Sequence, residues 1–224
     1  MANNVYQVIT IDGPAGSGKS TVSRLLARKL RRLYLDTGAL YRSVAFSAKR
    51  AGLTPEDSEK LGTLCANLDL HFDHTTDPPR IVLKDEDITK AIRSPEMDLL
   101  SSTISAVREV RVAMTRLQRR MAEEASVIAE GRDMGTVVFP EAKNKFFLTA
   151  SVTERAERRY KERLERGEKV SLSNVEEELI KRDEQDQTRA IAPLKPANDA
   201  LIIDTTNLGP EQVVGKIMDH LEGL

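Results

Sequence analysis

The chain has 224 residues and a mass of 25.0 kDa, a length typical of one folded unit with insertions. Hydrophobic residues make up 40% and charged residues 31%, which excludes collagen-like and low-complexity proteins. The 34 Lys and Arg nearly balance the 35 Asp and Glu, so the net charge of −1 argues against a nucleic-acid coat protein.

Cys65 is the single cysteine, so an internal disulfide is impossible and a reducing compartment is expected. No apolar run approaches the roughly 18 residues of a membrane helix, and the N-terminus lacks a secretion signal. We therefore predict a cytoplasmic protein that binds neither membrane nor nucleic acid.

The chain begins with a nearly continuous apolar, β-branched run from Val5 to Ile11, which predicts a strand buried on both faces. A glycine-rich turn follows, and apolar residues then recur at helical spacing from Ser20 to about Arg31. Short apolar runs predict four more strands, at Leu33–Leu35, Val127–Ala129, Phe146–Leu148 and Leu201–Ile203. This alternation predicts an α/β fold, a five-stranded parallel sheet flanked by helices. Together with the glycine-rich turn described below, the fold expected is of the phosphate-loop NTPase type.

Two stretches interrupt this alternation: a segment after the second strand and the charge-dense segment from Val152 to Arg189. Apolar and polar residues alternate from Leu68 to Phe72 and from Ile81 to Leu83 around a proline turn, which predicts a small antiparallel hairpin inserted between core elements. An amphipathic helix is expected from Glu96 to Ala125.

The segment from Val152 to Arg189 is dense in charge and predicts a helical hairpin with little apolar surface to bury. Gly167 would end its first helix, and Ser173 with Glu176 would form a capping box at the start of the second. With so few apolar anchors, we expect this hairpin to open in the free protein and to order over bound nucleotides.

The turn after the first strand reads Gly13-Pro14-Ala15-Gly16-Ser17-Gly18-Lys19-Ser20, a complete G-x-x-x-x-G-K-S phosphate loop. Its glycines allow successive N–H groups to point inward, and the following helix adds the positive end of its dipole. Lys19 is expected to reach the β and γ phosphates, and Ser20 to ligate Mg²⁺. The structural alternative is a glycine-rich connection without a ligand.

A phosphate loop alone does not separate a kinase from a GTPase, but no N-K-x-D tetrapeptide for guanine recognition occurs here. Arg155, Arg158 and Arg159 share about half the circumference of the first helix in the charge-dense segment and are predicted to converge on a transferring phosphoryl group. The alternative is a solvated helix face.

Polar residues follow the second and third strands, at the edge where a doubly wound sheet binds its ligands. Arg42, Arg132 and Asp133 are therefore placed to meet a second, phosphate-bearing substrate, although a structural ion pair between Arg132 and Asp133 is an alternative. Arg182, Asp186 and Arg189 form one helical stripe, which is also the spacing of helix-stabilising ion pairs.

Four motifs in this order closely resemble those of the bacterial cytidylate kinase family: G-P-A-G-S-G-K-S, D-T-G-A-L-Y-R, G-R-D-M-G-T-V-V-F-P and R-x-x-x-D-x-x-R-A-x-A-P-L. The resemblance runs from residue 5 to about 215. It implies one domain over 1–224, with a core at about 1–36, 97–150 and 190–224. It also implies a nucleoside-monophosphate-binding insertion with a small antiparallel sheet at about 37–96 and an Arg-rich lid at about 151–189.

The resemblance further implies ATP with Mg²⁺ as the phosphoryl donor and CMP or dCMP as the acceptor. ATP would bind the loop residues Gly13, Pro14, Ala15, Gly16, Ser17, Gly18, Lys19, Ser20 and Thr21. CMP would bind Thr37, Tyr41, Arg42, Ser102, Arg111, Arg132, Asp133, Arg182, Asp186 and Arg189. Within that set Ser102, Arg111 and Asp133 would read the cytosine, and Arg182 and Asp186 would contact the sugar.

The acceptor is itself a phosphate, mostly dianionic at neutral pH, so no protein general base is required and catalysis reduces to positioning and charge neutralisation. A small-metabolite kinase of the shikimate kind, with Asp36 as base, is one alternative. A protein that uses ATP as a conformational switch, or that binds nucleic acid, is another. We expect a monomer.

Overall fold

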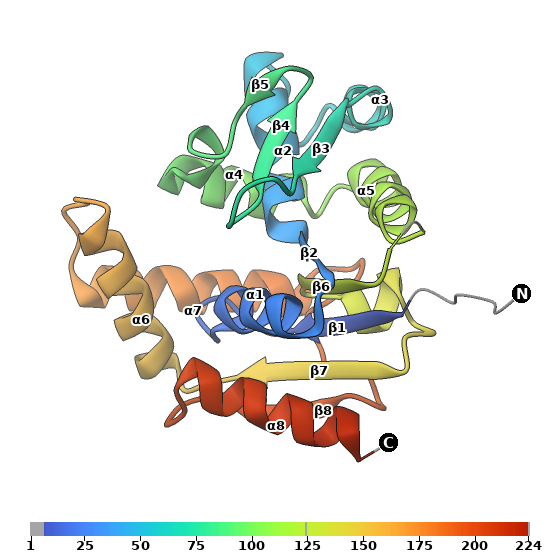
Figure 1. The fold of residues 1–224 in the computed structure, drawn as a ribbon. Helices are drawn as coiled ribbons and strands as arrows, with labels where there is room; N and C mark the ends of the chain where they lie inside the picture. Colours follow the sequence, from blue (N-terminus) through green and yellow to red (C-terminus); the bar gives the residue numbers. More distant parts are fainter. Residues whose placement is uncertain (1–6, 124, 224) are drawn as a thin grey trace, which may run out of the picture.

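The computed structural model describes residues 7–123 and 125–223. A five-stranded parallel sheet forms its centre, with strand order β2-β6-β1-β7-β8 (Figure 1). The strands span Val8–Asp12 (β1), Leu33–Asp36 (β2), Val127–Gly131 (β6), Asn144–Thr149 (β7) and Leu201–Asp204 (β8). The predicted α/β fold and its five parallel strands are confirmed, although Val5 and Tyr6 lie outside the described residues.

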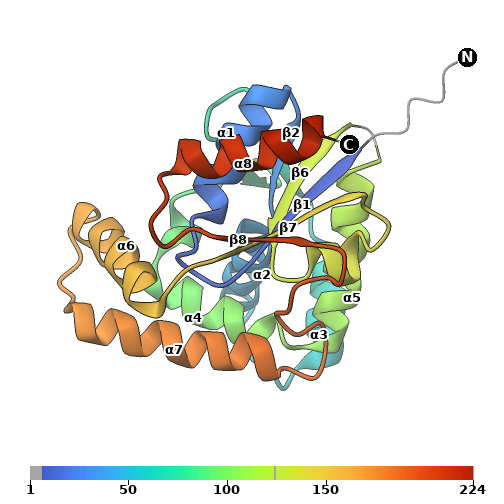
Figure 2. The same ribbon diagram turned by 90° about the horizontal axis from the view of Figure 1, so that it is seen from below.

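Helices cover both faces of this sheet (Figure 2). On one face, α1 (Lys19–Leu30) and α8 (Pro210–Glu222) pack over a core that includes Leu26, Phe146 and Ile217. On the other, α2 (Thr37–Arg50) and α5 (Arg108–Met121) enclose a second core that includes Leu40 and Met114. Burial of these side chains on both faces holds the carboxyl ends of the strands along one rigid edge.

A smaller layer follows α2 in the chain. It contains α3 (Ser58–Ala66), the antiparallel strands β3 (Leu70–Asp73), β4 (Arg80–Leu83) and β5 (Glu86–Asp87), and the short helix η1 (Ala91–Arg93). The predicted hairpin is therefore present and has a third strand, β5, which pairs with β4.

The single helix predicted from Glu96 to Ala125 is wrong, because two helices occupy this range: α4 (Pro95–Ile104) and α5. Ser94 caps α4 by accepting from the N–H of Met97 at 3.3 Å. At the other end, the Ser105 hydroxyl bonds the carbonyl of Ser102 at 2.9 Å and Val107 is extended, so local bonds of serine compete with the helix. Glu124 lies outside the described residues.

Helices α6 (Val152–Glu165) and α7 (Leu172–Thr188) form an α6–α7 hairpin beside the carboxyl edge of the sheet (Figure 1). The predicted capping box is wrong by two residues, since Ser171 caps α7 by accepting from the N–H of Asn174. The hairpin buries little apolar surface, as predicted: Ala156, Val175 and Leu179 form a small buried cluster of their own. Within the described residues, no helix is long and apolar enough to cross a membrane.

Candidate active site

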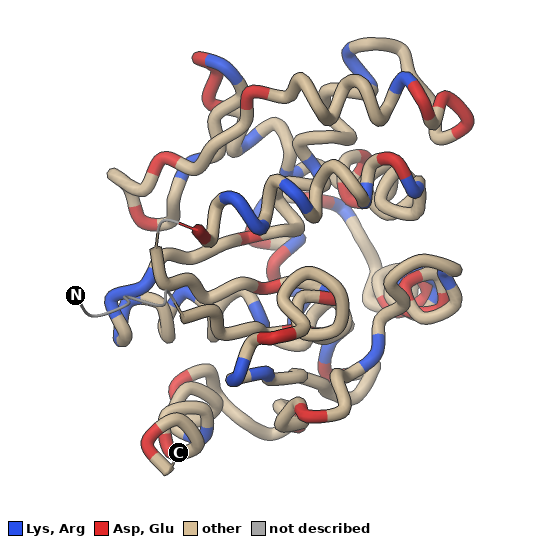
Figure 3. The backbone as a smooth tube through the Cα atoms, turned by 90° about the vertical axis from the view of Figure 1, so that its right-hand side faces the viewer, with Lys and Arg blue, Asp and Glu red and all other residues tan. Residues whose placement is uncertain are grey.

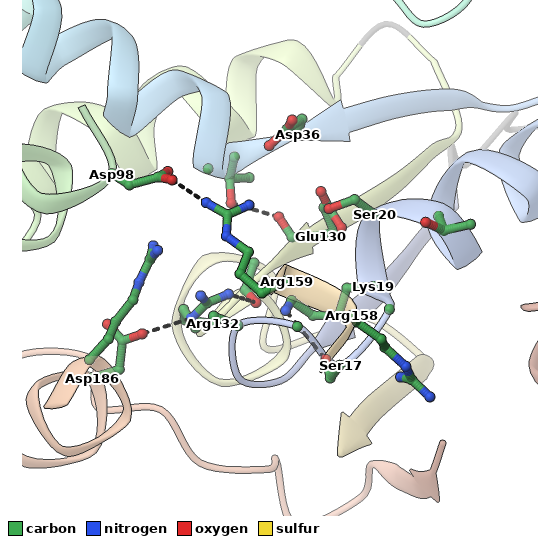
Figure 4. Close-up of a pocket in the computed structure, with 18 of the residues that line it drawn as sticks. Ser17, Lys19, Ser20, Asp36, Asp98, Glu130, Arg132, Arg158, Arg159 and Asp186 are labelled. Carbon is green, nitrogen blue, oxygen red and sulfur yellow. Dashed lines mark hydrogen bonds and ion pairs between the residues drawn. The ribbon is translucent and has the colours of Figure 1, made fainter. Parts of the chain in front are cut away.

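A cavity of about 840 Å³ opens at the carboxyl edge of the sheet, between the phosphate loop, α2, α4 and the α6–α7 hairpin (Figure 4). Strand register explains why its polar residues meet there: Asp36 of β2 lies opposite Glu130 of β6, and Asp12 of β1 lies opposite Gly131. The cavity therefore sits where an open parallel sheet presents its ligand site.

At two positions of the phosphate loop a Cβ would clash with a neighbouring segment, so glycine is required there. Gly13 has φ +147°, and a Cβ there would lie 2.0 Å from the carbonyl oxygen of Leu148 on β7. Gly16 has φ +76°, and its Cβ would lie 2.9 Å from the backbone of Arg155. Glycine at these positions lets the backbone of Leu148 and Arg155 approach the loop closely. The loop can then turn its N–H groups toward an anion at the start of α1.

Lys19 is buried at the floor of the cavity, where its Nζ donates to the carbonyl of Pro14 at 2.7 Å. Burial and the positive charge of Arg132 lower the pKa of this amine to about 7. A bound phosphate would place a negative charge beside this amine and raise its pKa again. Lys19 should therefore gain a proton when an anion binds.

Asp12 ties the phosphate-loop strand to the segment after β6. Its carboxylate accepts from the N–H groups of Met134 and Gly135 at 2.9 and 2.8 Å, at the start of the π-helical turn η2 (Met134–Val138). Burial raises its pKa to about 6. These two hydrogen bonds join the end of β1 directly to the turn that follows β6.

Glu130 is a buried acid that faces the cavity next to the loop, and sequence reasoning gave it no role. Its Oε1 accepts from the hydroxyl of Tyr34 at 2.6 Å, while Oε2 is buried without a hydrogen-bond partner. Burial and Asp36 raise its pKa, whereas Lys19, Tyr34 and Ser20 act in the opposite direction. An unpartnered carboxylate oxygen near Ser20 is a ready ligand for a cation.

Asp36 is engaged in ion pairs at the far side of the cavity. It caps α2 through the N–H of Ala39 at 2.8 Å and pairs with Arg93 at 3.0 Å and Arg42 at 3.6 Å. Burial acts to raise its pKa, but the two arginines hold it below the ordinary value. A carboxylate so stabilised is a poor proton acceptor, which argues against the alternative of Asp36 as catalytic base.

Arg111 and Asp133 form an ion pair that is almost completely buried. Arg189 approaches the other oxygen of Asp133 at 3.6 Å, and the guanidinium of Arg111 lies over the ring of Tyr41, 5.4 Å from its centroid. This cluster presents fixed donors and acceptors to one end of the cavity, an arrangement suited to the edge of a base.

Arg132 pairs with Asp186 rather than with its neighbour Asp133, at 2.8 Å, so the structural alternative of an Arg132–Asp133 pair is wrong (Figure 4). Arg182 lies beside this pair, where burial and Arg132 lower its pKa to about 10. Its Nε is buried without a partner. The stripe on α7 therefore reaches across the cavity instead of only bracing its own helix.

The three arginines of α6 do not converge, contrary to prediction. Arg155 lies behind the phosphate loop, where it donates to the carbonyl of Ala15 at 3.1 Å and pairs with Asp183 at 2.6 Å. Arg158 turns to Thr205 beyond β8, at 3.0 Å between Nη1 and the hydroxyl, and Arg159 turns the other way to Asp98 on α4 (Figure 4). Adjacent helical positions differ by about 100°, which sends Arg158 and Arg159 apart.

The structure brings most of the predicted residues to this one cavity. Among them, the lining includes Ala15, Gly16, Ser17, Gly18, Lys19, Ser20, Thr21, Thr37, Tyr41, Arg42, Ser102, Arg111, Arg132, Asp133, Arg158, Arg159, Arg182, Asp186 and Arg189. Gly13, Pro14 and Arg155 do not line it. Arg93, Asp98 and Glu130 were missed; only Glu130, at a predicted strand end, carried a signal in the sequence.

Eleven Lys and Arg and seven Asp and Glu line the cavity, a formal excess of four positive charges. The whole chain carries −1, and basic and acidic positions are interspersed along the backbone (Figure 3). The positive charge is therefore concentrated at the site, as a polyanionic ligand requires.

Comparison with known proteins agrees with this geometry. The family model described as cytidylate kinase matches residues 9–223. A cytidylate kinase of Geobacter sulfurreducens is 48% identical over 210 residues, which cover 94% of this chain and 90% of the relative. A cytidylate kinase of Pseudomonas savastanoi pv. phaseolicola is 49% identical over 216 residues, 96% and 94% of the two chains.

A solved structure of an uncharacterized protein from Eubacterium ventriosum shares the fold, with a TM-score of 0.55 at 12% identity, over 97% of this chain and 99% of that one. The family match and the two relatives extend over nearly the whole chain, the phosphate loop and the cavity included. The chain belongs to the cytidylate kinase family.

Proposed function

We propose that this protein transfers the γ-phosphoryl group of ATP to CMP or dCMP and releases ADP and CDP or dCDP. The observation that carries the proposal is the composition of the cavity. A phosphate loop lies at one end and the Arg111–Asp133–Arg189 cluster at the other, with arginines between them. MgATP with a nucleoside monophosphate brings about four negative charges, which the formal excess of four positive charges matches.

Three groups of residues would bind the substrates. The loop from Gly13 to Thr21 would hold the ATP phosphates, with Lys19 on the transferring group. Arg42, Arg132 and Arg189, with Thr37 and Tyr41, would hold the acceptor phosphate. Asp133, Arg111 and Ser102 would read the cytosine, whose exocyclic amine needs an acceptor and whose ring needs a donor, and Arg182 and Asp186 would hold the sugar.

The residues beside the loop fit Mg²⁺. A serine hydroxyl and a carboxylate are the hard oxygen ligands that this ion prefers, and the unpartnered Oε2 of Glu130 is available for it. The described residues contain no group of three or more His, Cys, Asp or Glu placed for a metal, which fits an ion held largely by phosphates and water. Ser20 and Glu130 would hold the ion, which when bound neutralises charge on the phosphates.

No residue needs to remove a proton, because the acceptor phosphate is already a nucleophile at neutral pH. The protein would align the two phosphates and place Lys19 and Arg159 on the transferring group, where charge is shared in the transition state. The α6–α7 hairpin, as a lid, would exclude the water that competes for ATP. We assign Arg155 a supporting place behind the loop.

The experiment is a coupled assay for ADP release, with MgATP and a panel of CMP, dCMP, UMP, AMP and shikimate. We expect CMP and dCMP to be preferred over UMP by at least about tenfold in kcat/KM, because a mismatched base leaves Asp133 and Arg111 unpaired. Equal turnover of UMP, or turnover of shikimate alone, would contradict the proposal.

The remaining assignments belong to the same proposal. We assign 37–96 to acceptor binding, 151–189 to the lid, and the ranges 1–36, 97–150 and 190–224 to the core of one domain. We expect the protein to be a cytoplasmic monomer. Sedimentation equilibrium measures the oligomeric state directly.

A further inference from the structure

We propose that Asp98 is a positioning residue that holds the lid arginine Arg159 inside the cavity before the substrates arrive. This inference rests on the proposed function only in naming the transferring phosphoryl group as the target of Arg159. Asp98 belongs to α4, whereas Arg159 belongs to α6 of the lid, so their contact joins two separate parts of the fold.

The geometry around Asp98 supports this role. One carboxylate oxygen pairs with Arg159, and the other approaches Arg42 of α2 at 3.8 Å. The Asp98 side chain is only 18% exposed and lines the cavity, where it faces Arg159 (Figure 4). Arg42 is proposed to hold the acceptor phosphate and Arg159 to meet the donor phosphate, so Asp98 spans the gap that the phosphoryl group must cross.

Arg42 and Arg159 can each bind a phosphate while they remain paired with Asp98. Each guanidinium has five N–H donors in a fork, and Asp98 occupies a minority of them. The second carboxylates, Asp36 beside Arg42 and Glu162 beside Arg159, do not use up the rest. The Nε of Arg42 is buried without a partner. A phosphate can therefore join the pair without displacing Asp98, and the carboxylate can orient both cations during turnover.

An unanchored arginine on a lid samples many rotamers, and ordering it costs free energy at the moment of reaction. A carboxylate that fixes Arg159 in advance removes this cost, which is the benefit of a preorganised site. The same contact favours the closed lid, and it is assisted at the end of α6 by Arg166, which donates to the carbonyl of Arg93 at 3.1 Å.

The chain offers a matched control. Glu162 also pairs with Arg159, at 3.1 Å, but lies on the same helix three residues away. Asp98→Asn removes the partner across the lid boundary, Glu162→Gln removes the partner within α6, and Asp98→Glu restores a carboxylate at the boundary.

The test measures lid position and turnover in parallel. Spin labels at Lys90→Cys and Lys169→Cys, both exposed positions, report the lid-to-insertion distance by pulsed electron resonance, and the buried Cys65 is left unlabelled. We expect Asp98→Asn to lengthen this distance in the nucleotide-free protein and to lower kcat about tenfold, with the KM for MgATP changed less than about threefold. Glu162→Gln and Asp98→Glu should resemble the wild type in both measurements.

Unchanged distance and kcat in Asp98→Asn would overturn the proposal, and so would equal effects in Glu162→Gln. If Asp98→Asn does not fold, the distance between the two labels is measured in the protein with Asp98 intact at increasing KCl concentration. Screening should weaken the partly exposed Asp98–Arg159 pair and lengthen this distance, and an unchanged distance would count against the proposal. The distance is measured without substrate, so it stands even if the coupled assay rejects CMP as the acceptor.

Discussion

Binding of nucleotide should load a proton onto Lys19. The free protein buries this amine next to Arg132 with a pKa of about 7, whereas its ordinary value is 10.5. A bound β-phosphate replaces unfavourable burial with a direct negative partner, so the pKa should return toward the ordinary value. At pH 8 about one-tenth of free Lys19 is protonated, and binding should therefore take up about 0.9 proton.

The assay is isothermal titration calorimetry of MgADP at pH 8 in two buffers with different ionisation enthalpies. MgADP is fully deprotonated at this pH, and Asp12, with a pKa of about 6, is ionised as well. The proton count follows from the difference in observed enthalpy between buffers. Affinity should also fall as pH rises, approaching tenfold per unit between pH 8 and 9.

The matched control is Lys19→Arg, which keeps the positive charge but does not titrate below pH 12. Its binding enthalpy should not depend on the buffer. A buffer-independent enthalpy in the wild type at pH 8 would falsify the assignment of a neutral amine to the free site.

Further predictions concern buried charges and the loop. Lys19→Met should raise the melting temperature at pH 7 by a few degrees while abolishing turnover; because the folded pKa lies below the unfolded one, Lys19 opposes folding below pH 7 and this penalty fades toward pH 10.5, so the gain should shrink in melts at alkaline pH. Glu130→Gln should lower kcat on the order of 10²-fold and raise the Mg²⁺ concentration for half-maximal rate, with the KM for CMP little changed; an unaltered Mg²⁺ titration would argue against it as a ligand. Asp133→Asn leaves Arg111 buried without its partner, and calorimetry should show a loss of about 3–5 kcal/mol in stability together with a weaker preference for CMP over UMP. Gly16→Ala should cost about 1–3 kcal/mol and misplace the loop, because its Cβ meets Arg155 at positive φ; a wild-type melt would contradict the stated contact.

The predictable part of this protein is the part determined by contiguous sequence. The phosphate loop was predictable because a tight turn, the close approach of a neighbouring strand and the start of a helix each require particular residue types within eight positions. The five strands were predictable because burial on both faces requires continuous apolar runs. Arg132 and Asp133 could be placed at the site because a strand end points to the ligand edge of the sheet.

Pairing across the cavity was not predictable in the same way. Arg132 and Asp133 are neighbours in sequence, but the chain direction after β6 sends one to Asp186 and the other to Arg111. Arg155 has the side-chain chemistry of a phosphate ligand. Only the packing of α6 against Gly16 shows that it faces the back of the loop. Asp98 lies in a helix whose break after Ile104 the apolar pattern did not reveal.

Several arginines of the lid already have an acidic partner in the nucleotide-free protein. Arg159 pairs with Asp98, and Arg163 pairs with Glu168 at 2.7 Å and with Glu178 at 2.6 Å.

Such pairing explains how a chain with a net charge of −1 can present a strongly basic cavity. Phosphate binding then becomes an exchange or sharing of partners, not a simple filling of empty cations. A polyanion that offers charge alone meets the negative charge of carboxylates already in place, whereas the proposed base and sugar contacts of a nucleotide would favour its binding. We therefore expect the acids of the cavity to contribute to selectivity, because an anion must overcome their negative charge before it binds.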